Sequence, residues 1–370
     1  MKKDHRTANH ALVRTINRAL ILNHLRRHAP QSRAELAERT GLTRSTVSSL
    51  VDDLREAKLI HETGIGPSRG GRPGTQLELN PAGGCAIGVE ITGDAALVML
   101  TDFVARPRWE RAFAVTDTEP DDVIPRVEAL IDAALQHNAE GEQMKPLGIG
   151  LGLSGLVNAA QGTLTASSTL GWQAIPFRER WERRFRLPVH VGNEASIAAL
   201  GEHYFGAARN TSDFIYLGIG TRAIGAGLFV NGDLFQGIDG YAGEVGHMQI
   251  DPAGPPCTCG KHGCWEALLR AAIAGQDHHA PDALARIAAI LSPGIANLVN
   301  VFNPQLVVLG GTVGRALAGV LPAIRASVQA QVVMPDDSRA EIVISEITSN
   351  ACALGAVACV LDDVMHDPAW

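Results

Sequence analysis

Two motifs within residues 240–266 decide which fold this chain adopts: Gly240-Tyr241-Ala242-Gly243-Glu244-Val245-Gly246-His247 and Cys257-Thr258-Cys259-Gly260-Lys261-His262-Gly263-Cys264-Trp265-Glu266. The second motif, together with His247, offers three thiolates and one imidazole, a ligand set that a tetrahedral zinc ion prefers. Four protein ligands leave no position for a catalytic water, so the pattern predicts a structural zinc site held by Cys257, Cys259, Cys264 and one histidine, for which His247 is a candidate. His262 is an alternative fourth ligand, and three unrelated buried thiols are the alternative to a metal site.

The rest of the composition indicates a folded chain that does not cross a membrane. Its 370 residues are 46% apolar and 19% charged, which favours two or three folded domains over disorder. The chain has no run of about 18 uncharged apolar residues, and no apolar segment follows the basic residues 1–6. Six cysteines in this length make no disulfide framework. We therefore expect a cytoplasmic protein.

Charge divides the chain into two parts. Residues 1–80 hold 14 Lys and Arg against 8 Asp and Glu, a net of +6, while residues 81–370 hold 18 against 31, a net of −13. A basic segment suits a polyanion such as DNA, although a solvated surface would show the same excess. The change falls at Asn80-Pro81-Ala82-Gly83-Gly84, which we interpret as a hinge without regular structure. We expect one domain over residues 1–80 and another over residues 81–370.

The basic part shows the pattern helix, tight turn, helix. Apolar residues at helical spacing predict a first helix over residues 15–28. Ser32-Arg33-Ala34-Glu35 has the spacing of a capping box, so a second helix should begin at Ser32. Gly41 can adopt the left-handed conformation that ends this helix, and Thr43 can cap a third helix over residues 44–57.

The third helix and the segment after it have the properties of a DNA reader. Short polar side chains at the start of the helix suit close approach to base edges. Strands predicted at 59–62 and 76–79 enclose a wing loop that contains Arg69-Gly70-Gly71-Arg72-Pro73, where glycines around an arginine permit insertion into a minor groove. A surface turn is the alternative reading of the loop. We expect DNA contacts from Arg33, Thr43, Arg44, Ser45, Thr46, Ser48, Ser49, Arg69 and Arg72.

The acidic part repeats one order of elements. The first set is three strands, a helix and a strand, predicted at residues 86–91, 95–100, 111–115, 123–137 and 147–153. The second set is three strands over 214–217, 224–230 and 234–235, then helices over 283–301, 316–331 and 351–362 that alternate with strands over 306–309 and 342–344. A duplicated α/β fold with a ligand cleft between two lobes is the natural architecture.

These motifs, taken in order, resemble the ROK family of repressors, open reading frames and sugar kinases. The resemblance rests on the two motifs quoted above and on Leu170-Gly171-Trp172, Leu187-Pro188-Val189-His190-Val191-Gly192-Asn193-Glu194-Ala195, Ala199-Leu200-Gly201-Glu202 and Val307-Val308-Leu309-Gly310-Gly311. It implies a duplicated actin-like, ribonuclease H-like ATPase fold with two lobes, as in sugar kinases. The N-terminal helix-turn-helix with its wing resembles the family's repressor branch.

The resemblance also implies a monosaccharide site. By this carry-over the sugar would be lined by Asn193, Glu194, Glu244, His247 and Glu266, with His247 also on the zinc. Carboxylates accept hydrogen bonds from neighbouring hydroxyls, and an amide supplies both donor and acceptor, so the residue types fit a sugar. Ser154 and Gly155, at a strand end, and Trp172 are further candidates for the cleft, although a turn and a core aromatic would look the same.

Three departures from the family's kinases favour a regulator over an enzyme. The first phosphate loop reads Ile91-Thr92-Gly93-Asp94-Ala95 instead of Gly-Gly-Thr, which places a carboxylate where phosphate oxygens would sit. The second, residues 220–227, is lengthened and has Ala223 in place of glycine. Glu194 stands where family kinases have the aspartate base, and a misplacement of roughly 1 Å can reduce a rate about a hundredfold. We expect no catalytic residue.

The sequence thus predicts a sugar-responsive transcription repressor for genes of carbohydrate uptake or catabolism, such as those for xylose or glucose. Its expected partners are operator DNA, a monosaccharide and a second copy of the chain, because a palindromic operator requires twofold symmetry. Whether the homodimer pairs further into a tetramer stays open. The alternatives are an active sugar kinase with a DNA-binding head, and a constitutive DNA-binding or scaffolding protein with a vestigial cleft.

Overall fold

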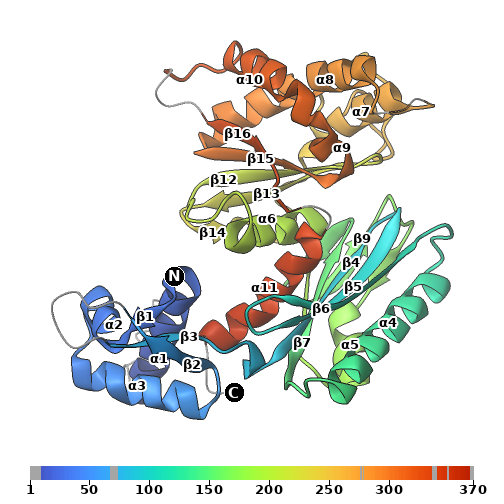
Figure 1. Cartoon of the computed structure of the whole chain (residues 1–370). Helices are drawn as coiled ribbons and strands as arrows, with labels where there is room; N and C mark the ends of the chain where they lie inside the picture. The colour runs from blue at the N-terminus through green and yellow to red at the C-terminus, as the bar shows by residue number, and fades with distance from the viewer. Residues whose placement is uncertain are drawn as a thin grey trace, which may run out of the picture.

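The computed structural model describes residues 10–66, 74–275, 277, 279–335, 340–347 and 350–366. A small N-terminal domain lies beside two α/β lobes, and two helices, α6 (Glu194–Phe205) and α11 (Ala351–His366), run through the region between them (Figure 1). Arg69 and Arg72, which we expect to contact DNA, lie outside the described residues.

The N-terminal domain is the winged helix that the sequence predicts. Its elements are α1 (His10–His28), β1 (Gln31–Ser32), α2 (Arg33–Thr40), α3 (Arg44–Glu56), β2 (Ile60–Ile65) and β3 (Thr75–Leu79), with sheet order β1-β3-β2. Ser32 and Glu35 form the predicted capping box, Gly41 is left-handed at φ 72°, and the Thr43 hydroxyl accepts from the Thr46 amide. The short strand β1 was not predicted, because two residues give no periodicity.

The first lobe is a five-stranded sheet of order β11-β7-β4-β5-β6. Its strands are β4 (Cys85–Ile91), β5 (Ala95–Asp102), β6 (Pro107–Ala114), β7 (Pro146–Leu153) and β11 (Val189–Asn193), with α4 (Pro120–Glu140) on one face. Between β7 and β11 the chain adds a small sheet and a helix that the sequence analysis missed: β8 (Leu156–Asn158), β9 (Thr163–Ala166), β10 (Gln173–Ile175) and α5 (Phe177–Phe185).

The second lobe repeats this topology with order β14-β13-β12-β15-β16. Its elements are β12 (Phe214–Ile219), β13 (Ile224–Val230), β14 (Asp233–Leu234), the 3₁₀ turn η2 (Val245–His247), α7 (Trp265–Ile273), α8 (Pro281–Phe302), β15 (Leu306–Gly310), α9 (Gly311–Ala316), η3 (Leu317–Val320), α10 (Leu321–Gln329) and β16 (Glu341–Ile344). In each lobe the first three strands, β4 to β6 or β12 to β14, pair in antiparallel fashion. The first of them, β4 or β12, also pairs in parallel with β7 or β15, which in turn pairs in parallel with β11 or β16. The predicted duplication is confirmed, although the single helix expected over 316–331 is broken.

The helices α6 and α11 connect the two lobes. The α6 helix leaves the first lobe and packs on β12 and β13 of the second, whereas α11 returns from the second lobe to pack on β4 and β7 of the first. A Cβ on Gly355 would overlap the backbone oxygen of Ile197, so glycine is required where the two helices touch. This close packing means that a displacement of either helix is transmitted to the other.

One described helix, α8, is long and apolar enough to span a membrane by length and composition alone. Its side chains Ile287, Leu291 and Ile295 are fully buried in the core of the second lobe. A core helix of a globular protein passes the same test, so α8 does not indicate a membrane protein.

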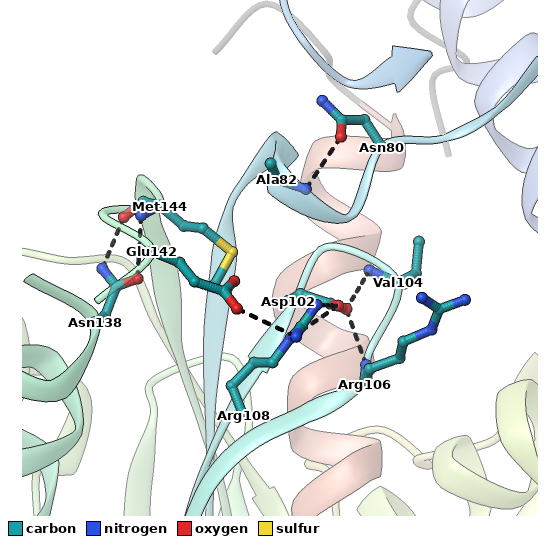
Figure 2. Close-up of polar contacts among 9 residues, drawn as sticks. All are labelled: Asn80, Ala82, Asp102, Val104, Arg106, Arg108, Asn138, Glu142 and Met144. Atoms are coloured by element: carbon teal, nitrogen blue, oxygen red, sulfur yellow. Dashed lines mark hydrogen bonds and ion pairs between the residues drawn. The ribbon is translucent and has the colours of Figure 1, made fainter. Parts of the chain in front are cut away.

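The segment between the winged helix and the lobes has regular structure, contrary to our expectation of an irregular hinge. Residues Pro81–Gly83 form the 3₁₀ turn η1, and Asn80 caps it by accepting a hydrogen bond from the Ala82 amide at 3.1 Å (Figure 2). The amide of Phe103 donates to the Pro81 oxygen at 3.1 Å, and its ring packs against Gly83. These contacts fix the winged helix to the first lobe.

The turn that carries Phe103 is held by Asp102, which is fully buried. Its carboxylate accepts the backbone amides of Val104 at 3.0 Å and Arg106 at 2.9 Å, and it pairs with the Arg108 guanidinium at 2.7 Å (Figure 2). Four hydrogen bonds therefore compensate the desolvation of one charge.

Replacing Asp102 with Asn should destabilise the protein by about 3 kcal/mol, because a buried neutral amide cannot accept all four hydrogen bonds that the carboxylate accepts. Urea unfolding measures this change in the free energy of unfolding. The control is Asp122→Asn, which removes an exposed pair with Arg126 and should change stability by less than about 0.5 kcal/mol. Equal unfolding midpoints for the two variants would contradict the role given to Asp102.

Candidate functional site

Four side chains from the two opening motifs converge in the second lobe. The ligand atoms of His247, Cys257, Cys259 and Cys264 all lie within 4.8 Å of one another. The Sγ atoms of Cys259 and Cys264 are 3.6 Å apart, and Cys257 Sγ lies 3.6 Å from His247 Nδ1. Zinc–sulfur bonds of about 2.3 Å in a tetrahedron place two thiolates roughly 3.8 Å apart, so the spacing fits a metal ion.

Glycines shape the loop that presents these ligands. Gly260 and Gly263 are left-handed, at φ 86° and 64°, and a Cβ on Gly263 would overlap the backbone oxygen of Asp251. Cys264 precedes α7 directly, and the neighbouring Trp265 anchors that helix in the core. The side chain of His262 is exposed and does not belong to the group of four. The described cluster can hold a metal through His247 rather than His262.

Two of the expected sugar residues adjoin this cluster. Glu266 is 5% exposed, and its Oε1 lies 3.6 Å from His247 Nδ1 and 3.3 Å from Cys257 Sγ. Burial raises the pKa of Glu244, and the nearby His247 opposes that rise. Glu244, His247 and Glu266 therefore form one polar group at the turn η2, next to the strand β13.

The other expected sugar residues form a second group, where β7 and β11 end and α6 begins. Ser154 Oγ donates to the Glu194 carboxylate, and Asn193 Nδ2 donates to the Gly155 oxygen at 3.0 Å. Asn193 Oδ1 also accepts the backbone amides of residues 195 and 196, at 2.9 and 3.2 Å, and so caps α6. Only one N–H of the Asn193 side-chain amide is left for a ligand. The main role of Asn193 in this structure is therefore to cap α6.

Both groups adjoin the start of β13. Gly225 packs against Ala195 at the start of α6, and Gly246 lies against the Ile224 backbone beside Glu266. Tyr241, in the loop before η2, contacts Thr165 of the first lobe through hydroxyls 3.0 Å apart. Among the described residues, no hydrogen bond or ion pair joins one group directly to the other.

Glu90, on β4, is a candidate that the sequence analysis missed. Burial, and then the charge of Glu194, raises the pKa of Glu90 to about 8, while Arg315 opposes the rise. Burial also raises the pKa of Glu194, against the hydrogen bond from Ser154. At neutral pH the pair is therefore partly protonated and can donate as well as accept hydrogen bonds. The available signal was a single carboxylate within the apolar strand 86–91.

Trp172, by contrast, is a buried core residue of the first lobe. Its indole nitrogen donates to the backbone oxygen of Thr118. Of the two readings left open from the sequence, the structure favours the core aromatic.

The two segments that resemble phosphate loops touch each other. Asp94 pairs with Arg222 at 2.9 Å and accepts from the Thr221 hydroxyl at 3.0 Å. Asp94 belongs to the first lobe and the other two residues to the second, so the contact spans the lobes. The contact therefore places a carboxylate between the two segments.

Some side chains that we expect to contact DNA are exposed, and others already form hydrogen bonds or ion pairs within the protein. Arg44 and Ser45 are exposed at the start of α3, and Thr46 and Ser48 are partly exposed. Thr43 serves as the N-cap, and the exposed Ser49 accepts from Arg14 at 3.3 Å. Arg33 pairs with Asp52 at 2.7 Å, so a DNA phosphate would have to compete with that carboxylate.

Comparison with known proteins agrees with both parts of the fold. A family model described as ROK family matches residues 86–272 and 269–363, and one described as MarR family matches residues 14–69. The xylose repressor of Bacillus spizizenii is 33% identical, over 96% of this chain and 97% of its own length.

Two solved structures show the same architecture. A ROK family transcriptional regulator, described as a homolog of the E. coli MLC protein, has a TM-score of 0.78 at 24% identity and covers 96% of this chain and 97% of that one. A ROK family glucokinase from Streptomyces griseus, in complex with glucose and AMPPNP, has a TM-score of 0.64 at 28% identity. The match covers 75% of this chain and 99% of the glucokinase chain. The predicted winged helix and sugar-kinase-like lobes are confirmed.

Replacing Cys259 with Ser should reduce the metal content of the purified chain well below one ion and lower its thermal stability, because metal binding contributes to folding. Cys259 is exposed, so the substitution leaves the apolar core unchanged. Elemental analysis and thermal unfolding measure the two effects. Cys359→Ser, at a cysteine outside the cluster, is the control. One tightly held metal in both variants would exclude Cys259 as a ligand.

Proposed function

Because this chain belongs to the ROK family and is a sugar-responsive transcriptional repressor of that family, we propose that a monosaccharide bound between its lobes makes the winged helix release operator DNA. The observation that carries the proposal is the joint presence, in one continuous fold, of a recognition helix and two sugar-kinase-like lobes. A relative named as a xylose repressor covers the same full length. We propose an aldose of the xylose class as the effector.

The two polar groups beside β13 would hold the sugar from both lobes. Glu244, Glu266 and His247 would accept or donate hydrogen bonds on one side, and Glu194 with Ser154 on the other. A partly protonated Glu90–Glu194 pair suits hydroxyls, which are both donors and acceptors. Asn193 and Gly155 contribute the shape of the site more than contacts, since most of their polar atoms are already paired.

We propose zinc as the metal of the cluster, held by His247, Cys257, Cys259 and Cys264. A thiolate-rich closed set favours zinc, which would supply structural stability. In this arrangement Nδ1 of His247 faces Cys257 and the opposite nitrogen, Nε2, remains for a sugar hydroxyl. The metal cluster would therefore fix the orientation of a sugar-binding imidazole.

The helix α6 would carry the signal to the winged helix (Figure 1). It begins at the sugar site with Glu194 and ends about 18 Å away, at 1.5 Å per residue. In its last turn Tyr204 donates to Asp362 of α11 at 2.6 Å, and the other oxygen of Asp362 binds Arg26 of α1 at 2.6 Å. A sugar that shifts the start of α6 would thus move the residues that hold α1.

Repression of a palindromic operator would require a homodimer, and we propose that assembly in the cytoplasm, with further pairing to a tetramer left open. Twofold symmetry would place two recognition helices about one DNA turn apart, and a change in lobe closure would alter their spacing. The sugar must bind the released state more tightly than the DNA-bound state for this to work.

We propose that the chain has lost kinase activity. The carboxylate of Asp94, which pairs with Arg222 and Thr221, would repel the oxygens of a phosphate at this loop, and this supports the proposal. The similarity to a glucokinase structure makes an active kinase the second candidate. Steady phosphorylation of xylose or glucose by ATP, at an ordinary turnover rate, would establish it instead.

Replacing Arg44 with Ala should weaken operator binding about tenfold or more, because one contact with DNA is worth about 1–3 kcal/mol. Gel-shift titration at several salt concentrations measures this. Arg183→Ala removes an equally charged side chain, 72% exposed on α5, as the control. Equal operator affinities for the two variants would remove the start of α3 from the DNA interface.

Replacing Glu244 with Gln should raise the sugar concentration needed for operator release by about tenfold or more, since a charged acceptor is lost. Operator binding without sugar should stay unchanged. Fluorescence anisotropy of labelled operator, titrated with xylose and related aldoses, gives both values. Glu179→Gln, exposed on α5, is the control. A normal response in Glu244→Gln would disprove the sugar site.

A further inference from the structure

A cavity lies at the junction between the winged helix and the lobes, away from the proposed sugar site. Its volume is about 200 Å³. It is formed where the ends of α1 and α6 meet the loop after α6, and its lining comes from Arg26, Arg27, His203, Tyr204, Arg209, Asn210, Thr211, Ser212 and Gly232. Most sites for drug-sized ligands are larger, about 300–1,000 Å³, so this cavity suits a small group.

The lining of this cavity is cationic. It includes three guanidinium groups, and none of its described residues is acidic. Asp362 pairs with Arg26, but in the described part of the chain neither Arg27 nor Arg209 has a carboxylate within 4.0 Å. Asp213 follows the lining residue Ser212, and its oxygens accept the Ser212 hydroxyl and the Asn231 amide. Two positive charges are therefore left without a counter-charge.

His203, which also lines the cavity, lies close to the same positive charges. Its Nδ1 is buried and has no hydrogen-bond partner among the described residues. Burial lowers the pKa of His203, and the positive charges of Arg27 and Arg26 lower it further, against smaller opposing effects of Asp362 and Thr211.

We propose that this cavity binds a phosphate group, either as inorganic phosphate or carried by a small metabolite. Guanidinium groups match phosphate oxygens with paired hydrogen bonds, and the hydroxyl of Thr211 adds a neutral donor. The three cationic side chains come from two parts of the chain, Arg26 and Arg27 from α1 and Arg209 from the loop after α6. An anion between them would join the winged helix to the lobes.

Such an anion would act at the same junction that transmits the sugar signal. Arg26 already binds Asp362, and its guanidinium lies 4.1 Å from the centre of the Tyr204 ring. A phosphate that holds α1 against α6 would favour one arrangement of the two parts over the other. The cavity would then be a second effector site, separate from the sugar site.

Isothermal titration of the full chain with inorganic phosphate tests the proposal, in the Glu244→Gln background so that the sugar site plays no part. We expect saturable binding, and the double variant Arg27→Gln/Arg209→Gln should weaken it about tenfold or more because two charge-assisted contacts are lost. The control double variant Arg126→Gln/Arg183→Gln removes the same charge from the surface and should bind normally. Equal binding by the two double variants, or no saturation with phosphate, would overturn the proposal.

Two further titrations identify the source of the phosphate group. Glucose 6-phosphate, compared with inorganic phosphate and with glucose, shows whether a phosphorylated sugar binds more tightly than the free anion, and either order supports the site. Operator affinity of the Arg27→Gln/Arg209→Gln variant in phosphate-free buffer should equal that of the control. A loss of affinity with a smaller salt dependence would assign these arginines to the DNA backbone and overturn the proposal.

Discussion

The packing of the winged helix against α11 is the constraint on which the rest of the structure depends. One buried apolar cluster contains side chains of both parts: Leu22, Leu25, Leu54, Leu77, Ala86, Leu147, Val360, Leu361 and Val364. Separating the two parts would expose apolar surface to water, at a free-energy cost of about 25 cal/mol for each Å² exposed. The winged helix must therefore move together with α11. In a dimer, the spacing of the two recognition helices would then depend on the position of each α11.

Features governed by local backbone geometry could be predicted from the sequence. The boundaries of α2 follow from the Ser32–Glu35 capping box and from Gly41, because these residues satisfy backbone groups at the helix ends themselves. The cysteine cluster was predictable for a similar reason, since its spacing and glycines determine a short loop. The duplicated order of elements was visible because each lobe repeats the same strand pattern.

Features that depend on distant partners could not be predicted. The segment after Asn80 looks like a hinge until Phe103, from another turn, packs on it. The sequence predicts Arg33 as a DNA contact but does not predict its ion pair with Asp52, 19 residues later. The sequence predicts Asn193 as a sugar ligand but does not predict the hydrogen bonds by which its amide caps α6 and binds the Gly155 oxygen. The raised pKa of Glu90 arises only when the fold buries it beside Glu194.

The geometry of α6 explains how two ligands could oppose or support each other without contact. Its first residues belong to the proposed sugar site, and its last turn, with Tyr204 and His203, lines the cationic cavity. Both ligands would then bias one equilibrium between docked and released arrangements of the winged helix. Linkage requires the effect to be reciprocal, so a phosphate that stabilises the docked arrangement must weaken the releasing sugar by the same factor that the sugar weakens the phosphate. A repressor built in this way would respond to the concentrations of both the sugar and the phosphate through one group of contacts, which joins Arg26, Asp362 and Tyr204.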